Sequence, residues 1–223
     1  MFITKVWPFR RLLPDNLTED VLRCHLVSGA APLYNVFPAR SCSKIDSVII
    51  NKEILQLFTK WINKNSKEIL YEFNLLFRSS RDGFSSYTFH QKCDNKGATI
   101  VVGKISNSNQ LVGGYNPLDW NGNGQYKNTT DSFLFSISDL KNATLGRVTY
   151  GHQAVYCNNN YGPTFGAHDL YAPNNNSNWQ YNVVYYSSIN LSGSVTISNY
   201  EVFQVVKKIS LSLTFKSVIS AFY

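Results

Sequence analysis

Two serines, one histidine and three acidic residues are the side chains that could together form a hydrolytic centre. They are Ser79, Ser80, His90, Asp82, Asp94 and Glu201. In such a centre a serine attacks the substrate, the histidine removes its proton, and a carboxylate orients the histidine. The turn that usually carries such a serine has the pattern Gly-x-Ser-x-Gly, which surrounds neither Ser79 nor Ser80. We therefore expect no catalytic residues, and we expect His90 to be a structural histidine beside Phe89.

The four cysteines predict neither a metal site nor a disulfide framework. They are Cys24, Cys42, Cys93 and Cys157. A zinc site usually contains two cysteines about two to four residues apart, and a small disulfide-rich domain has closely spaced cysteines. The four cysteines of this chain are scattered, so we expect free thiols, no metal and no cofactor.

A short polar segment around Gly83 is expected to form a tight turn. Glycine permits backbone angles that other residues avoid. Arg81 and Asp82 precede this glycine. We expect them to form the ion pair or the loop cap that holds the turn.

Glu201 is a carboxylate in an otherwise apolar segment, between Tyr200 and Val202. Alternation along a strand places Glu201 on the same face as Phe203. A carboxylate at such a position must either face solvent or find a partner. We expect a paired, partly buried Glu201, and we expect Glu201→Ala to destabilise or disable the domain.

Several short periodic segments could form the elements that position these side chains. Apolar residues recur every three to four positions from Lys52 to Lys64, which predicts a helix, and a shorter helix is predicted at residues 84–93. Strands are predicted at residues 45–51, 71–77, 99–105, 110–115, 132–137, 148–153, 169–171, 188–191 and 199–206. Many short strands and few helices predict a mainly β fold with flanking helices (α+β), in which two sheets pack as a β-sandwich.

The two ends of the chain differ from its periodic middle. Leu17, Val21, Leu22 and Leu26 fit one short amphipathic helix, and the prolines and serines that follow predict a linker. We therefore expect residues 1–44 to be a helical appendage and linker, and residues 45–208 to be the domain. The apolar run at residues 209–223 is either an added strand or a non-native extension.

The formal charge is +7, from 21 Lys and Arg against 14 Asp and Glu, which suggests an anionic partner. Basic residues stand mostly singly or in pairs, without alternating basic and aromatic residues, so we expect no nucleic-acid partner. The chain has no apolar run of about 18 residues, and no transmembrane helix is predicted. The N-terminus lacks the long apolar core of a secretory signal. We expect a cytoplasmic, monomeric protein.

Asn-rich stretches at residues 121–128, 158–160 and 174–182 are expected to be surface loops, because asparagine favours turns. An alternative is a set of sugar-binding loops whose aromatic side chains stack on the ligand. The stacking residues would be Trp120, Tyr126, Trp179 and Tyr181.

One ordered series of motifs is more specific than any periodicity. It runs through residues 71–84 (YEFNLLFRSSRDGF), 89–97 (FHQKCDNKG), 99–102 (TIVV), 113–115 (GGY), 117–120 (PLDW), 131–135 (DSFLF), 162–166 (GPTFG), 169–170 (DL) and 200–203 (YEVF). In this order the series resembles the TLDc domain over residues 45–206. With residues 9–14 and 45–50 it is similar to fungal proteins in which TLDc follows BTB and BACK domains. Those two domains are absent here, so we expect a truncated member or a partial gene model.

The resemblance implies a β-sandwich of TLDc type and a non-catalytic protein-interaction module. It also implies binding to subunits of the vacuolar proton ATPase and protection against oxidative stress. The signature positions, for partner binding or for structure, are Arg81, Asp82, Gly83, Phe84, His90, Asp94, Gly114, Trp120, Gly166, Asp169 and Glu201. The animal relatives differ by a glycine-rich run before the segment that matches Asp169, and by Trp-Gly in place of Phe203 and Gln204.

Two other functions stay open. The family's link to oxidation resistance suggests an enzyme or thiol-based antioxidant acting through Cys93 or through Ser80 and His90. A reactive thiol needs exposure and a lowered pKa, and we expect Cys93 and Cys157 to be buried and inert instead. A BTB domain upstream in the full gene would make the chain the substrate-recognition module of a ubiquitin ligase.

Overall fold

The structure is a computed structural model that describes residues 45–64 and 69–208. The appendage and linker expected at residues 1–44 and the extension at residues 209–223 lie outside the described residues. The helices are α3 (Lys52–Ile62), α4 (Ser79–Asp82) and α5 (Ser86–Cys93), with the 3-10 turn η2 (Gly151–Gln153). The strands are β1 (Tyr71–Arg78), β2 (Thr99–Ile105), β3 (Leu111–Asn116), β4 (Asn123–Lys127), β5 (Phe133–Ile137), β6 (Ala143–Arg147), β7 (Val155–Asn158), β8 (Tyr161–Phe165), β9 (Leu170–Pro173), β10 (Asn178–Tyr181) and β11 (Ser194–Lys207).

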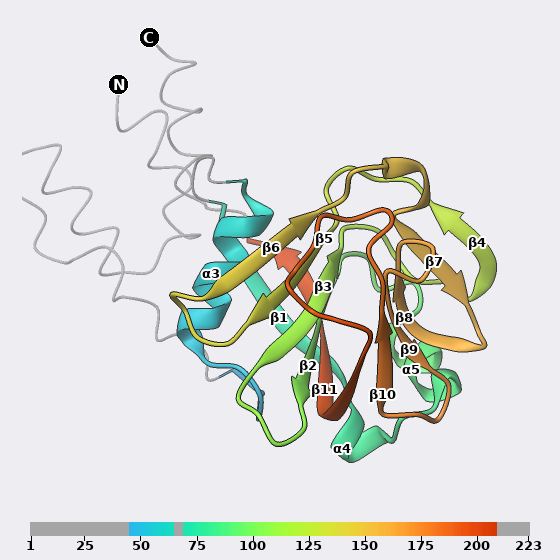
Figure 1. Cartoon of the computed structure of the whole chain (residues 1–223), viewed down its shortest axis with the longest axis horizontal. Helices are drawn as coiled ribbons and strands as arrows, with labels where there is room; N and C mark the ends of the chain where they lie inside the picture. The colour runs from blue at the N-terminus through green and yellow to red at the C-terminus, as the bar shows by residue number, and fades with distance from the viewer. Residues whose placement is uncertain (1–44, 65–68, 209–223) are drawn as a thin grey trace, which may run out of the picture. The chain divides into compact units, whose positions relative to one another are not determined.

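The strands form two antiparallel layers that share the long strand β11 (Figure 1). The last part of β11 lies between β1 and β2, in a layer with the order β1-β11-β2-β3-β5-β6. Its first part pairs with β10, which starts a second layer with the order β10-β9-β8-β7-β4. The prediction of a mainly β, two-layered fold with flanking helices is confirmed.

Side chains from both layers meet in an inner core. Val101 in β2 and Leu134 in β5 pack there with Val155, Phe165 and Trp179 from the other layer, and all five are buried. Burial of this apolar surface contributes about 25 cal/mol per Å². The inner core therefore holds the two layers together.

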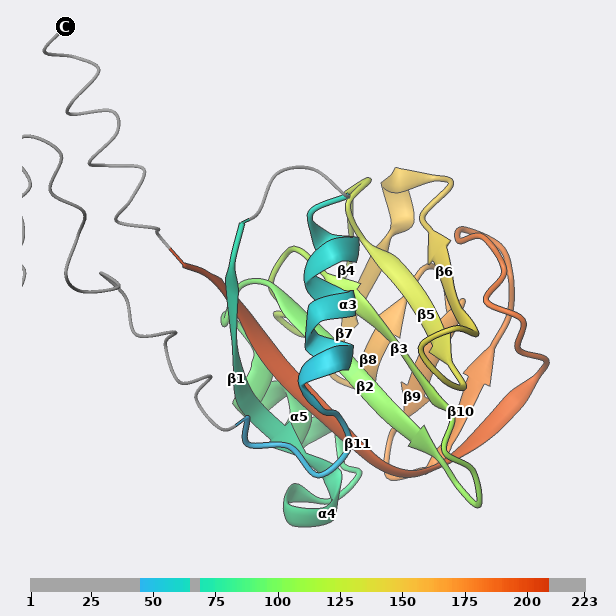
Figure 2. The same cartoon turned by 90° about the vertical axis from the view of Figure 1, so that its left-hand side faces the viewer.

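Helix α3 covers the other face of the first layer (Figure 2). Its Phe58 is completely buried and lies 4.9 Å from Phe135, ring centre to ring centre. In β2, Ile100 and Val102 point toward α3 while Val101 points toward the second layer. Because β2, β3 and β5 are covered on both faces, their sequences are apolar runs without polar alternation.

Three predicted strands are wrong. Residues 45–51 form bends, because Ser47 Oγ accepts hydrogen bonds from the backbone N–H groups of Ile49 and Ile50 and removes them from any ladder. Residues 148–153 contribute only an isolated bridge from Val148 and the turn η2. Residues 188–191 form no strand.

Five strands, β4, β6, β7, β8 and β10, were not predicted. Each has only four or five residues, and several contain Asn, Gly or Pro. In β8, Pro163 cannot donate to a ladder, and the pairing of β8 with β9 is irregular between Tyr161 and Thr164. Tertiary pairing, rather than local preference, makes these segments strands.

Candidate functional site

A buried ion pair joins the end of β1 to β11. The antiparallel register places Arg78 directly opposite Glu201. Arg78 Nε donates to Glu201 Oε1 over 2.6 Å, and the Glu201 side chain is completely buried. A buried pair stabilises only when other groups satisfy the remaining hydrogen-bonding capacity of both ions.

The segment before α3 supplies those groups. Ser47 Oγ donates to Glu201 Oε2 over 2.5 Å, and Val48 N donates to Glu201 Oε1 over 3.1 Å. Arg78 Nη2 reaches Asp46 Oδ1 at 2.8 Å. The Glu201 cluster, defined as Asp46, Ser47, Val48, Arg78 and Glu201, therefore fixes the start of the domain to its last strand.

A second carboxylate, Asp82, holds the turn into α4. It accepts hydrogen bonds from Arg78 N at 3.0 Å and from Arg81 Nε and Nη2 at 3.0 and 2.8 Å. Lys92 Nζ lies 3.4 Å away. Burial alone would raise the Asp82 pKa, but these donors lower it to about 2. The expected ion pair of Arg81 with Asp82 is present, and Gly83 ends α4 with a bond from its N–H to Ser79 O.

The serines are held by β11. Ser79 Oγ donates to Asn199 Oδ1 and accepts from Tyr200 N, each over 2.8 Å. Ser80 N also donates to Asn199 Oδ1, over 3.1 Å. Ser79 is buried, and its hydroxyl serves to connect α4 to the backbone of β11.

His90 lies in a different set of contacts. Its Nδ1 is 2.8 Å from Asp94 Oδ1, and its Nε2 is 3.1 Å from Asn158 O and 3.0 Å from Tyr161 O. Within the described residues neither Ser79 nor Ser80 is hydrogen-bonded to His90. Of the six residues considered for hydrolysis, His90 therefore contacts only Asp94. Asp82 and Glu201 instead accept hydrogen bonds from Arg78.

The thiols are enclosed. Cys93 and Cys157 are free cysteines with completely buried side chains in the inner core. Burial raises the pKa of both thiols. A raised pKa disfavours the thiolate, which is the nucleophilic form.

Asp169, which directly precedes β9, is a buried carboxylate like Glu201. Its Oδ2 accepts from the consecutive N–H groups of Val184, Tyr185 and Tyr186, at 2.7 to 3.0 Å. Burial is the largest influence on its pKa, which is raised despite these donors. Gly166 has a φ of +65°, and a Cβ there would lie 2.1 Å from Asp169 Oδ1. Gly166 and Asp169 together fix the loop that follows β10.

Three further signature residues, Trp120, Gly114 and Phe84, contribute to packing inside the domain. Trp120 is completely buried, donates from Nε1 to Thr99 Oγ1 over 2.8 Å, and contacts Phe165. A Cβ at Gly114 would lie 2.7 Å from the Phe165 ring, so glycine permits the close approach of the two layers. Phe84 packs on Tyr200.

The sugar-binding alternative loses three of its four stacking residues. Trp120, Trp179 and Tyr181 are buried, with exposed fractions of 0%, 1% and 7%. Tyr126 is exposed on β4. A buried ring cannot stack on a ligand, so this arrangement of residues is wrong.

Residues 45–64 and 69–208 contain neither a membrane-spanning helix nor a metal-binding cluster. None of the helices at residues 45–64 and 69–208 is both long and apolar enough to cross a membrane. The same residues contain no group of three His, Cys, Asp or Glu side chains placed to hold a metal ion.

Sequence reasoning missed Arg78, Ser47 and Asn199. Arg78 and Ser47 lie 123 and 154 positions from Glu201, so no local pattern connects them. The only signal for Arg78 was its place as the basic residue that directly follows the strand predicted at residues 71–77.

Comparison with protein families matches residues 43–206 to the family described as the TLDc domain. Comparison with curated proteins found no match.

Proposed function

The chain belongs to the TLDc domain family, and from this premise we propose that it works as a non-catalytic protein-interaction module. The supporting observation is that its chemically capable side chains are used in internal contacts. Glu201, Asp82 and Asp169 each bind groups of the domain itself. His90 binds Asp94 and two backbone carbonyls. These contacts build a rigid scaffold that can present a surface to a partner.

The proposed partner is the vacuolar proton ATPase, and the proposed outcome is protection against oxidative stress in the cytoplasm. The support for this finer assignment is the family resemblance. One departure from the animal relatives is Phe203 with Gln204, and of the two only Phe203 is completely buried, in the core under α3. Gln204 Nε2 donates to Lys96 O. The substitution at Phe203 therefore leaves the domain surface unchanged at that position.

A binding experiment with the purified cytosolic sector of the ATPase tests the assignment. The full chain is immobilised, and we expect the wild type to retain the sector. Glu201→Ala should retain less of it at temperatures near its lowered melting temperature, because a smaller fraction of the domain is folded there. The matched control is Glu72→Ala, which removes an exposed carboxylate from β1, the neighbouring strand, and should bind as the wild type does.

Two results would overturn the proposal. A folded wild-type chain that retains none of the sector would remove the ATPase assignment. Catalytic consumption of hydrogen peroxide that disappears in Cys93→Ser would show an enzyme or thiol antioxidant instead of a binding module.

A further inference from the structure

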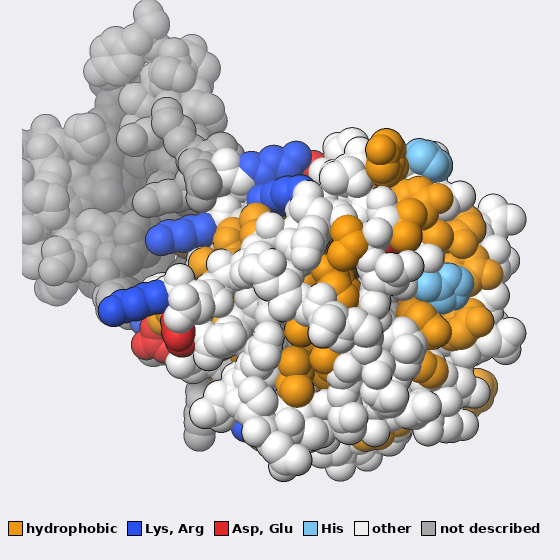
Figure 3. Space-filling model, viewed as in Figure 1, with side chains coloured by type: hydrophobic (Ala, Val, Ile, Leu, Met, Phe, Trp, Pro, Cys, Tyr) orange, Lys and Arg blue, Asp and Glu red, His pale blue; other side chains and the backbone are white. Residues whose placement is uncertain are grey.

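The second layer carries few charges, and Lys127 in β4 is paired with Asp119 over 2.7 Å. Asp169 is the only Asp, Glu, Lys or Arg between Arg147 and Glu201, and it is completely buried. This stretch forms β7, β8, β9 and β10 with their loops. Figure 3 shows apolar and histidine side chains on the surface over these strands, whereas the basic and acidic side chains visible in this view gather mostly on the α3 side.

A continuous group of rings occupies the outer side of this layer. We define the tyrosine face as Tyr126, Tyr156, Tyr161, His168 and Tyr171. Each ring belongs to a different strand or connection of the β4-β7-β8-β9 layer. Neighbouring ring centres are 4.6 Å apart for Tyr126 and Tyr156, 5.2 Å for Tyr161 and His168, and 4.8 Å for His168 and Tyr171.

Strand alternation explains why these rings face outward. Val155 and Cys157, on either side of Tyr156, are buried in the inner core, and Leu170 and Ala172 flank Tyr171 in the same way. All five rings of the tyrosine face are at least partly exposed. Helix α5 meets this layer at Tyr161, whose carbonyl oxygen lies 3.0 Å from His90 Nε2, whereas α3 covers the first layer (Figure 2).

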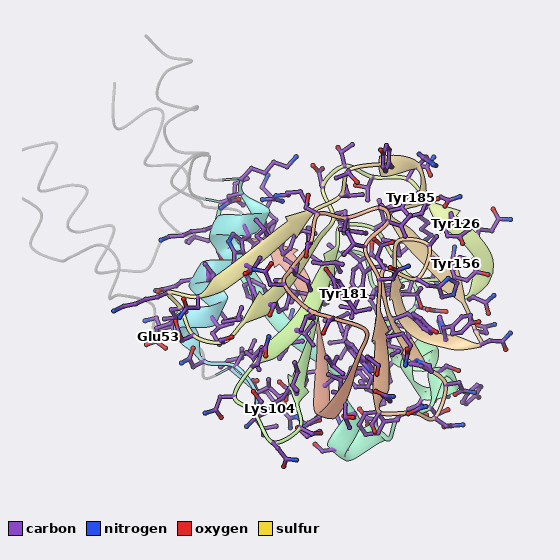
Figure 4. All side chains as sticks on the ribbon, in the orientation of Figure 1. Glu53, Lys104, Tyr126, Tyr156, Tyr181 and Tyr185 are labelled. Carbon is purple, nitrogen blue, oxygen red and sulfur yellow. The ribbon has the colours of Figure 1, made fainter. Side chains whose placement is uncertain are left out.

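The tyrosine face extends across four strands of the second layer. Neighbouring strands lie about 4.8 Å apart, so β4 to β9 spans about 14 Å. Tyr150, His152 and Tyr185 form a second ring group, with Tyr150 exposed at 59%. Tyr185 adjoins the tyrosine face next to Tyr126 (Figure 4).

The chemistry of the face selects an uncharged partner surface. Protein interfaces are enriched in tyrosine and depleted of Lys, Glu and Asp. Tyrosine gives a large contact at a low cost in side-chain entropy, and the mutual packing of these rings orders them before binding. A charged group buried against this face would find no opposite charge and would lose its hydration.

The ring geometry favours a protein over a saccharide. A saccharide stacks on open ring faces, whereas Tyr161, His168 and Tyr171 meet edge to face, at 81° to 85°. Each ring thus covers part of another. The result is a rough surface of ring edges and hydroxyls, which suits interdigitating side chains.

We propose that the tyrosine face is the docking surface of the domain, and that its occupant is a protein partner that presents an uncharged surface of amide, hydroxyl and apolar side chains. This inference rests on the proposed function, because it names the surface by which the interaction module binds.

Photo-crosslinking in cells of the source organism tests it. The full chain carries p-benzoylphenylalanine in place of Tyr126 or Tyr156, or, as matched controls, in place of Glu53 or Lys104, which lie far from the tyrosine face (Figure 4). We expect one protein to cross-link from Tyr126 and Tyr156 and not from the controls. Mass spectrometry identifies this protein, which is then purified for affinity measurements.

The affinity measurements use the identified protein and two variants with wild-type melting temperatures. Tyr156→Ser and Tyr171→Ser should each weaken binding about 10-fold or more. Because the contact is uncharged, the affinity of the wild type should change by less than about two-fold when salt rises from about 50 to about 300 mM.

Each other outcome overturns the inference. Cross-links from Glu53 or Lys104 alone would leave the interaction function standing and place the docking surface elsewhere, while no cross-link from any position would remove the proposed function as well. Cross-links between two copies of the chain would make the occupant a second copy. Specific binding of neutral hexasaccharides that is lost in Tyr156→Ser would make the face a sugar site.

Discussion

Replacing Glu201 by alanine breaks a buried ion pair and leaves its partners without an acceptor. The carboxylate accepts from Arg78, Ser47 and Val48 and is itself completely buried. Removing one member of a buried pair costs about 3–5 kcal/mol, mostly because the other charge stays desolvated. The Arg78 side chain is 15% exposed and keeps Asp46 at 2.8 Å. We therefore expect Glu201→Ala to lower the free energy of unfolding by about 3 kcal/mol, the lower limit of this range.

Thermal and denaturant unfolding of the full chain measure this loss. In a domain of this size about 1 kcal/mol shifts the melting temperature by about 2–4 °C, so Glu201→Ala should melt about 6–12 °C below the wild type. Glu72→Ala is the matched control, since Glu72 is exposed in the adjoining strand. Its melting temperature should stay within about 2 °C of the wild type.

A double variant separates the effect of breaking the Arg78–Glu201 ion pair from the effect of removing side-chain volume at position 201. Arg78→Met with Glu201→Leu replaces both ions by apolar side chains of similar size, a change that is often close to neutral. We expect it to be more stable than Glu201→Ala. If Glu201→Ala melts with the wild type, or if the double variant is no more stable than Glu201→Ala, the reasoning on the Glu201 cluster is refuted.

Three further predictions concern other buried groups. Gly166→Ala should cost about 3 kcal/mol, because it adds a Cβ at positive φ against a fixed carboxylate, whereas Gly193→Ala, at positive φ in open space, should cost only about 1 kcal/mol by denaturant unfolding. Cys93 and Cys157 should resist a thiol reagent in the folded chain and react after unfolding, as followed by peptide mass spectrometry; rapid labelling in the folded state would contradict their burial. Asp82 has a folded pKa of about 2, below its ordinary value of 3.8, so it should contribute about 2 kcal/mol of stability near neutral pH that is lost as the pH falls from about 4 to about 2. Unfolding measured across this range should show a smaller acid loss in Asp82→Asn, and an unchanged loss would argue against these contacts.

Much of the scaffold around the site was predictable from local pattern. The strand predicted at residues 99–105 matches β2, and the helix predicted at 52–64 matches α3 apart from its last two residues. These segments are long or strongly periodic. The short strands of the second layer were not predicted, because the Asn, Gly and Pro residues within them favour turns. Pairing with strands that are distant in the chain makes these segments strands.

The candidate site was predictable only in part. The need of Glu201 for a partner was predictable, because Glu201 is a carboxylate in an apolar strand. The structure shows that this partner is Arg78. The choice of Arg78 depends on the β1–β11 register. His90 and the two serines are close in sequence, yet α4 and α5 direct them to different neighbours.

The sequence by itself determined the family, the mainly β class and the need of Glu201 for a partner. The family follows from the order of motifs along residues 71–203, whereas the fold class and the need of Glu201 for a partner follow from alternation within short segments. Tertiary structure decided which groups meet Glu201 and which tyrosines face solvent. Hydrogen-bond registry joins residues more than a hundred positions apart, and the side of a strand that is buried depends on what the other layer covers.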